Sequence, residues 1–208
     1  MTVAGPGYAR AMTTAPDASV APPLPAEPVA LQRLESPIGR IEVVGDGTAI
    51  VALAIERDGL LPHDELDVRP DEVTRRAVAQ LEEYFAGERR AFDVPVVLHG
   101  TAFQRAVWEQ LVELQWGEVI SYGELGRGTG RATAGRAVGG AVGANPVPII
   151  VPCHRVLGAN GVITGYSGGE GIPTKSWLLD HEGIPHRVPA GPADPAPTLD
   201  IPGTESAA

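Results

Sequence analysis

Short apolar runs separated by turn residues characterise the first half of the chain. Residues 31–55 contain two β-rich runs, IEVVG and TAIVALAI, which are separated by the pair Asp46-Gly47. Such a pair between two β-rich runs is typical of a hairpin turn. FDVPVVL at residues 92–98 is again rich in β-branched and aromatic residues and predicts a further strand. The pattern therefore predicts a small antiparallel sheet.

Helical spacing begins at residues 71–86, where apolar positions including Tyr84 recur on one face. Later in the chain, Thr101 and Gln104 form a capping-box pair that predicts the start of another helix. The N-terminal half thus combines the sheet with one helix, and the part of the chain after residue 100 turns to a helical pattern.

A pair of short helices is predicted next. Ser121 and Glu124 repeat the capping-box pattern, so a short helix should begin at Tyr122. A glycine-rich turn leads to a second helix within residues 133–146, which an Asn-Pro pair ends. Two short helices joined by a turn have the form of a helix-turn-helix, although this pattern alone is weak evidence for nucleic-acid binding.

The two ends of the chain differ in composition from the rest. Residues 1–29 and 188–208 are rich in Ala and Pro and carry few large apolar groups, so we expect disordered tails. Between them we expect an α/β domain over residues 30–99 and a mostly α-helical domain over residues 100–187. The last helix of the second domain is predicted to begin at Thr174.

No apolar run approaches the roughly 18 residues that a membrane-spanning helix requires. The N-terminal segment also lacks the apolar region of a signal peptide. We therefore expect a cytoplasmic protein without a membrane partner.

The net charge of −10 at pH 7 argues at first against nucleic acid as a partner. The charge is unevenly distributed, however. Residues 122–155 contain only one acidic residue, Glu124, and four basic ones: Arg127, Arg131, Arg136 and Arg155. This stretch includes the predicted helix-turn-helix, so a nucleic-acid-binding face is compatible with the charge distribution.

Cys153 is the only cysteine, and it lies between the apolar run PVPIIV and a glycine-rich loop. It could be a small buried core residue or a reactive thiol. A reactive thiol requires a nearby cation, imidazole or helix N-terminus, and His154 is adjacent in the chain. A structural zinc site needs about four ligands, which this cysteine and five scattered histidines do not supply. We therefore expect no metal and no cofactor.

Several segments match one known family in order along the chain. PCHRV, preceded by NPVPIIV and followed by GYSGG, is accompanied by GTAFQRAVWEQL, GEVISYGEL and KSWLLDHEG. These segments resemble the O6-alkylguanine-DNA alkyltransferases, also called methylated-DNA–protein-cysteine methyltransferases. SPIG and YFAGE resemble the family's N-terminal domain, whose fold is ribonuclease-H-like. The resemblance covers about residues 31–185, and PCHRV in this context is highly specific.

The resemblance implies DNA repair by direct transfer of a methyl or other alkyl group from O6 of guanine to Cys153, with O4 of thymine as a further candidate. The thioether product is stable and no second cysteine could regenerate the thiol, so each molecule should react once. By resemblance, Glu182 orients His154, which deprotonates Cys153 through a water. Asn145 ties the recognition helix to the active-site turn.

The partner implied is double-stranded DNA containing O6-alkylguanine, bound through its minor groove by a monomer. The target base must be flipped out of the duplex before the sulfur can reach it. By resemblance, Arg136 fills the space that the base leaves, and Tyr122 helps to rotate the phosphate. The small residues Gly139, Gly140 and Ala141 would let the second helix approach the DNA backbone closely.

The resemblance also implies a substrate pocket. Tyr166, Ser167 and Gly168 belong to the loop that walls the alkyl group, and the Ser167 amide would donate to guanine O6. The carbonyl groups of Cys153 and Val156 would accept hydrogen bonds from the guanine amino group.

Two other functions compete with repair. An alkyltransferase-like protein would bind lesions without repairing them, but such relatives lack the cysteine present here at position 153. A cysteine hydrolase would turn over esters or peptides, but the sequence shows neither a separate catalytic histidine nor an oxyanion loop.

Overall fold

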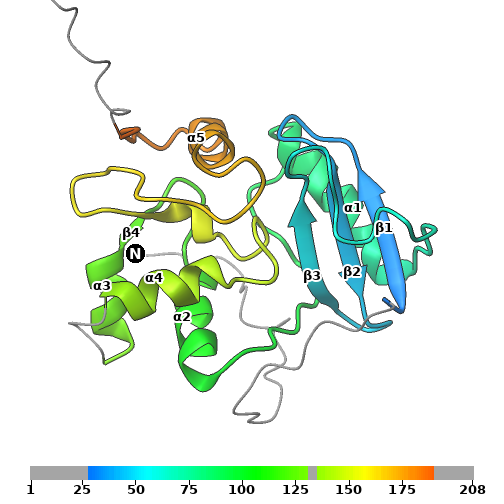
Figure 1. Cartoon of the computed structure of the whole chain (residues 1–208), viewed down its shortest axis with the longest axis horizontal. Coiled ribbons are helices and arrows are strands. Elements are labelled where there is room, and N and C mark those ends of the chain that lie inside the picture. The colour runs from blue at the N-terminus through cyan, green and yellow to red at the C-terminus, as the bar shows by residue number, and fades with distance from the viewer. Residues whose placement is uncertain (1–27, 131–134, 190–208) are drawn as a thin grey trace, which may run out of the picture.

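The computed structural model of the chain describes residues 28–130 and 135–189. Its N-terminal part is a three-stranded antiparallel sheet in the order β1-β2-β3. The strands are β1 (Ala30–Leu34), β2 (Ile41–Gly45) and β3 (Ile50–Ile55). Helix α1 (Glu72–Phe85) packs against this sheet (Figure 1). The predicted small sheet with one helix is therefore confirmed.

The predicted hairpin between β2 and β3 forms at its expected turn. Gly47 has a φ of +95°, a conformation that glycine adopts without a steric penalty. The Asp46 carboxylate accepts hydrogen bonds of 2.8 Å from the backbone amides of Thr48 and Ala49. These bonds fix the turn, and the pairing of Val43 with Leu53 follows from it.

Residues 92–98 do not form the predicted strand. Alternate side chains are buried as a strand pattern requires, at Phe92, Val94, Val96 and Leu98. The backbone nevertheless makes only one bridge to the sheet, between Ile50 and Val96. Pro95 lies in the middle of the segment and has no amide hydrogen to donate, so the hydrogen-bond ladder cannot continue there.

The C-terminal part is mostly helical, as predicted. Its helices are α2 (Ala102–Val112), α3 (Tyr122–Gly128), α4 (Gly135–Gly143) and α5 (Ile172–His181). A 3-10 turn, η2 (Cys153–Arg155), leads into a short strand, β5 (Val156–Leu157), which pairs in parallel with β4 (Ile120–Ser121). Helices α3 and α4 lie next to each other and above α2 (Figure 1), in the arrangement that the helix-turn-helix pattern predicts.

Both predicted capping boxes are present. The Gln104 amide donates to the Thr101 hydroxyl at 3.2 Å, and the Thr101 amide donates to the Gln104 side chain at 2.8 Å. Ser121 and Glu124 make the same exchange at the start of α3. Helices α2 and α3 therefore begin where the local sequence predicts.

The start of α5 differs from the prediction. The helix begins at Ile172 rather than at Thr174, because Pro173 fits the first turn, where an amide hydrogen has no partner within the helix. Thr174 is buried, and its hydroxyl accepts a hydrogen bond of 3.0 Å from the Glu170 amide. Its role is to hold the preceding loop.

One apolar core joins the two parts of the chain. The same cluster of buried residues includes Val43 and Leu81 from the first part, and Leu111 and Cys153 from the second. The predicted tails lie outside the described residues, apart from residues 28–29 and 188–189. Among the described residues, no helix combines the length and the apolar character needed to cross a bilayer.

Candidate active site

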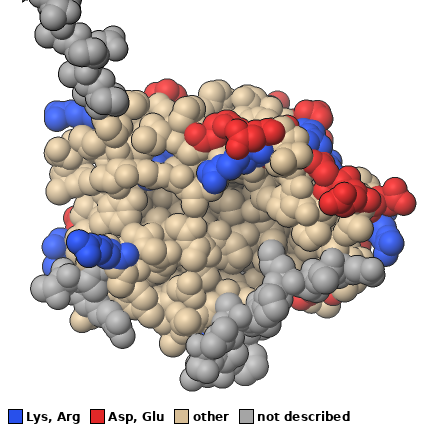
Figure 2. Space-filling model, viewed as in Figure 1, with Lys and Arg blue, Asp and Glu red and all other residues tan. Residues whose placement is uncertain are grey.

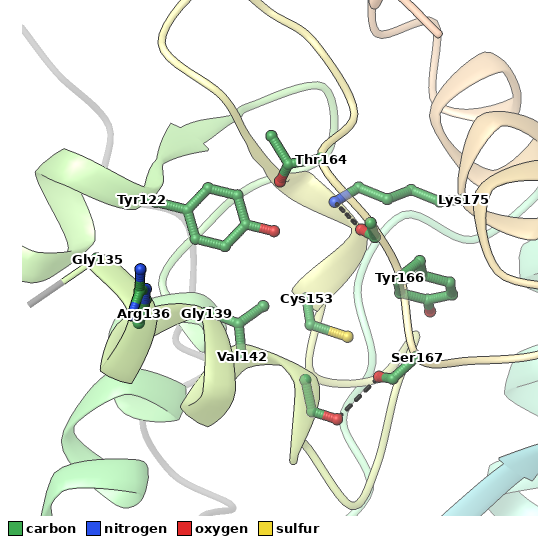
Figure 3. Close-up of a pocket in the computed structure, with 12 residues that line it drawn as sticks. Tyr122, Gly135, Arg136, Gly139, Val142, Cys153, Thr164, Tyr166, Ser167 and Lys175 are labelled. Atoms are coloured by element: carbon green, nitrogen blue, oxygen red, sulfur yellow. Dashed lines mark hydrogen bonds between the residues drawn. The ribbon is translucent and has the colours of Figure 1, made fainter. Parts of the chain in front are cut away.

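Cys153 is at the beginning of η2 and borders a cavity of about 570 Å³. The close-up in Figure 3 shows the sulfur between two walls. Tyr122 and Val142 form the wall on the side of α3 and α4, and Tyr166 and Ser167 form the wall on the side of the loop before α5. Only 3% of the surface of Cys153 is exposed, and the residue lines this cavity, so a reactant can approach the thiol from there.

Asn145 holds the turn that delivers the cysteine. Its side-chain amide donates to the Val151 carbonyl at 2.8 Å, and its side-chain oxygen accepts from the Val147 amide at 3.1 Å. Between them, Ile149 has a φ of +73°, a strained conformation for a β-branched residue. Asn145 lies two residues after the last residue of α4, Gly143, so it links the end of that helix to the segment before Cys153.

The imidazole of His154 and the carboxylate of Glu182 form a buried pair, with 2.9 Å between Nε2 and Oε1. Glu182 lies at the C-terminal end of α5. Burial opposes its ionisation, but hydrogen bonds from His154 and Arg155 outweigh this effect and lower the pKa of Glu182 to about 2. The carboxylate is therefore ionised at neutral pH and can only accept hydrogen bonds.

This pairing determines the tautomer of His154. Because Glu182 accepts, Nε2 carries the hydrogen and Nδ1 presents its lone pair. Nδ1 is buried without a hydrogen-bond partner in the described part of the chain. Burial also lowers the pKa of His154, so the imidazole is neutral at pH 7 and able to accept a proton.

Two partners of Glu182 were not singled out by the sequence patterns. Arg155 donates from Nε to Oε2 at 2.6 Å and from Nη2 to Oε1 at 2.9 Å. The Tyr84 hydroxyl, from α1, donates to Oε1 at 3.0 Å. Arg155 belongs to the PCHRV motif, so its place beside the catalytic residues could have been inferred from the sequence. The contact of Tyr84 with Glu182 is evident only from the fold.

The thiol itself is held in its protonated form. Burial raises the pKa of Cys153. The Asn145 side chain, the charge of Lys175 and the Tyr166 hydroxyl act in the opposite direction without cancelling the effect of burial. Transfer of the thiol proton to a base is therefore needed before the sulfur can act as a strong nucleophile.

Lys175 is a further cavity residue that the sequence patterns did not indicate. Its Nζ donates to the Val156 carbonyl at 2.6 Å. It also reaches the Gly165 carbonyl at 3.4 Å, a contact that Figure 3 shows. Burial lowers the pKa of Lys175 to about 8. This lysine therefore supplies a positive charge near the sulfur at neutral pH.

The predicted pocket residues divide into two groups. Tyr166 and Ser167 line the cavity at Cys153, and the Ser167 hydroxyl donates to the Gly143 carbonyl at 2.8 Å. Val156 is buried behind the cavity, with its carbonyl group bound to Lys175. Gly168 borders a neighbouring cavity instead, and a side chain there would meet the Tyr166 ring at 2.8 Å.

The predicted DNA-binding residues also separate. Tyr122, Arg136 and Gly139 line the cavity, and Gly140 is exposed beside them on α4. Ala141 is only 3% exposed, and its carbonyl group accepts a hydrogen bond of 2.8 Å from the buried Trp108 indole. Ala141 therefore packs α4 against α2, and its small side chain also remains compatible with a close approach of the helix to the DNA backbone.

The surface charge agrees with the uneven distribution in the sequence. On the face shown in Figure 2, acidic side chains lie mainly towards α5 and the sheet. The surface over α3 and α4 is largely neutral, with basic side chains at its edge. The entrance to the cavity is thus not surrounded by acidic residues on this face.

Comparisons with known proteins extend over both parts of the chain. Residues 31–98 match the ribonuclease-like domain of 6-O-methylguanine DNA methyltransferase, and residues 102–184 match the DNA-binding domain of the same family. The methylated-DNA–protein-cysteine methyltransferase of Methanosarcina acetivorans is 46% identical over 151 residues, which are 72% of this chain and 95% of the relative. That of Mycobacterium bovis is 44% identical over 149 residues, covering 72% of this chain and 89% of the relative.

A solved structure is similar as well. The crystal structure of Mycobacterium tuberculosis OGT in complex with DNA has a TM-score of 0.66 and 44% sequence identity, covering 74% of this chain and 92% of that one. A buried cysteine at a cavity, a neutral histidine paired with a glutamate and the matches to both domains lead to one conclusion: the chain belongs to the 6-O-methylguanine DNA methyltransferase family.

Proposed function

We propose that this protein repairs DNA by moving an alkyl group from O6 of guanine to the sulfur of Cys153. The observation that carries the proposal is the cavity, which ends at a buried thiol next in the chain to a histidine with an available Nδ1. The names of the relatives support the same activity, because they are methylated-DNA–protein-cysteine methyltransferases.

In the proposed reaction the sulfur–carbon bond forms as the carbon–oxygen bond to guanine O6 breaks. His154 first takes the thiol proton at Nδ1, through a water, and the ionised Glu182 stabilises the resulting imidazolium. The leaving guanine regains one proton, so no net proton is consumed. The thioether is stable and Cys153 is the only cysteine, so each molecule reacts once.

Substrate binding is proposed to use the cavity walls. The Ser167 amide donates to O6, and the carbonyl groups of Cys153 and Val156 accept from the guanine amino group. The Val156 carbonyl has a second lone pair beyond the one that Lys175 uses, so it can still accept. Tyr166 forms the wall beside the alkyl group.

The DNA partner is proposed to bind as a duplex, through its minor groove, with α4 as the recognition helix. Arg136 is exposed in the first turn of α4 at the cavity mouth, which suits a side chain that replaces the flipped base. Tyr122 lies across the cavity from the loop and would rotate the phosphate. Gly139 and Gly140 leave room for the DNA backbone, since a Cβ atom added at either position would meet no atom closer than 4.0 Å.

We also infer a division into domains at residues 30–99 and 100–187. The limits of the two family matches support it. The protein is proposed to act as a monomer, and in the cytoplasm.

The test is the intact mass of the protein after incubation with a duplex that contains one O6-methylguanine. We expect a gain of one methyl group, located in the Cys153 peptide and absent in Cys153→Ser. An undamaged duplex is the control, and a duplex with O4-methylthymine tests the second lesion. Binding of the O6-methylguanine duplex without a mass gain would refute repair and leave a lesion-binding protein.

A further inference from the structure

The loop at residues 167–170, which closes one side of the cavity, is held from the N-terminal sheet. Arg57, just after β3, donates from Nε to the Gly169 carbonyl at 2.7 Å and from Nη2 to the Ser167 carbonyl at 3.0 Å. The backbone amide of Asp58 donates to the Glu170 carboxylate at 2.8 Å. A single arginine therefore holds the loop on both sides of Gly168.

The position of Arg57 is itself well defined. The amide of Arg57 donates to the Leu60 carbonyl at 3.1 Å, and the amide of Leu60 donates to the Arg57 carbonyl at 2.9 Å. Between them, Asp58 and Gly59 have φ values of +52° and +76°. Positive φ at both central residues is the geometry of a tight two-residue hairpin turn. The arginine thus extends from a rigid turn rather than from a free loop.

The loop separates two cavities. The first, of about 570 Å³, contains Cys153, and the second, of about 580 Å³, is lined by apolar residues that include Leu53, Leu61 and Pro148. Gly143 and Ser167 line both cavities. The loop and the Gly143–Ser167 contact thus form a wall between the two cavities, which we call the partition. Figure 3 shows the 2.8 Å hydrogen bond of this contact from the side of the first cavity.

The loop has little free space against β3 and α5. A Cβ atom at Gly169 would lie 2.6 Å from the Thr174 hydroxyl and 2.9 Å from the Ile55 side chain. The Glu170 amide is bound to the same Thr174 hydroxyl at 3.0 Å. The partition is thus fixed by α4 through Ser167, by α5 through Glu170 and by the N-terminal sheet through Arg57.

We propose that Arg57 is a specificity-determining positioning residue, which sets the size of the alkyl group that can reach Cys153. By binding the carbonyl groups of Ser167 and Gly169, it keeps the partition closed and the Ser167 amide in place for guanine O6. Without this anchor, part of the second cavity becomes accessible to a bulky group. A methyl group gains nothing from that space and loses the fixed amide. The inference rests on the proposed function.

The experiment compares single-turnover rate constants for two duplexes of identical sequence, one with O6-methylguanine and one with O6-benzylguanine. Any effect of the lost charge on DNA binding is common to both duplexes and cancels in the ratio. For Arg57→Ala we expect the benzyl-to-methyl rate ratio to rise about tenfold, from the loss of two hydrogen bonds. Arg57→Lys keeps the charge but offers a single nitrogen instead of the guanidinium fork, so it should give an intermediate ratio.

Arg75→Ala is the matched control. Arg75 is also an exposed arginine of the N-terminal part, and it donates to a backbone carbonyl, that of Pro70, at 3.0 Å. Its removal changes the net charge equally and should leave the ratio unchanged. Equal slowing of both substrates in Arg57→Ala, or an unchanged ratio, would overturn the proposal.

A second measurement does not depend on alkyl transfer. Hydrogen exchange of the amides of Glu170 and Gly171, which are bonded to the Thr174 hydroxyl and the Gly168 carbonyl, reports the opening of the loop. Exchange in this segment should accelerate in Arg57→Ala and not in Arg75→Ala. Failure of the wild-type protein to transfer any alkyl group would refute the proposed function, whereas unchanged exchange refutes the anchoring role of Arg57.

Discussion

The hydroxyl of Tyr84, in α1, donates a hydrogen bond of 3.0 Å to Oε1 of Glu182, a residue 98 positions later in the chain. The same oxygen lies 2.9 Å from Nε2 of His154. The N-terminal part therefore contributes directly to the carboxylate that orients the proposed base. Arg155 balances the charge of this carboxylate, which lets the imidazole remain neutral in a buried site.

Tyr84→Phe should remove this hydrogen bond while keeping the ring that packs against Trp116 and His181. A hydrogen bond to a charged group contributes about 2 kcal/mol, so we expect the free energy of unfolding to fall by about that amount. Alkyl transfer should slow only a few-fold, because Glu182 keeps its bonds to His154 and Arg155. Denaturant unfolding and single-turnover kinetics measure the two effects, and an unchanged free energy of unfolding would contradict the first.

Glu182→Gln should make the free energy of unfolding depend less on pH between pH 4.5 and 2. The pKa of Glu182 in the folded protein is about 2, below its usual value of 4.5. Ionised Glu182 therefore stabilises the folded state above pH 4.5, and this contribution is lost as the pH falls towards 2. It amounts to about 3 kcal/mol.

Urea unfolding of the wild type and of Glu182→Gln at several pH values between 4.5 and 2 checks this expectation. The two stability curves should converge towards the acid end of this range. The exposed Glu113→Gln is a control that should follow the wild type. Parallel curves for wild type and Glu182→Gln would show that the carboxylate is not linked to folding in this way.

Lys175→Met should make the thiol less reactive. The positive charge of Lys175 lowers the pKa of Cys153, so its removal raises that pKa further. A change of one pKa unit alters the thiolate population about tenfold, and we expect a loss of this order in the rate of reaction with iodoacetamide at pH 7. Lys175→Arg keeps the charge and should lose less.

The pH dependence of this effect follows from the lysine itself. Lys175 has a pKa of about 8, so the wild-type protein loses the cation as the pH rises through that value. The ratio of wild-type to Lys175→Met reactivity should therefore be largest below pH 8 and fall above it. A ratio that stays constant from pH 7 to pH 9 would exclude the electrostatic role.

Arg136→Ala should impair repair of duplex DNA far more than reaction with free O6-benzylguanine. The side chain is exposed at the cavity mouth on α4, where it is proposed to act on the flipped duplex and not on the sulfur. Single-turnover rates with the two substrates give the comparison directly. Equal losses on both would place Arg136 in the chemical step instead.

Much of the secondary structure was predictable because its signals are local. The Asp46-Gly47 turn and the two capping boxes depend on residues within four positions of one another, and all three were found where expected. Two predictions failed for equally local reasons. The strand predicted at residues 92–98 does not form, because Pro95 interrupts its hydrogen bonds to the sheet. Helix α5 begins before Thr174, because Pro173 is accepted in its first turn.

The segment PCHRV was enough to indicate Cys153 and His154, because motif and chemistry lie together in the chain. Glu182 needed the family resemblance, since a glutamate at the end of a helix is usually a solvated carboxylate. The packing of Ala141 against Trp108 was not predicted, because the sequence pattern does not indicate which helix lies against α4.

The partners of these residues follow from the fold alone. Tyr84 reaches Glu182, and Arg57 reaches Ser167, across about a hundred residues of chain, and no local periodicity encodes such distances. Burial then keeps the thiol protonated and the imidazole neutral, whereas hydrogen bonds from His154 and Arg155 keep the Glu182 carboxylate ionised against the effect of burial. Residue types and short-range order are properties of the chain, whereas desolvation and long-range contacts exist only once the two parts have packed together.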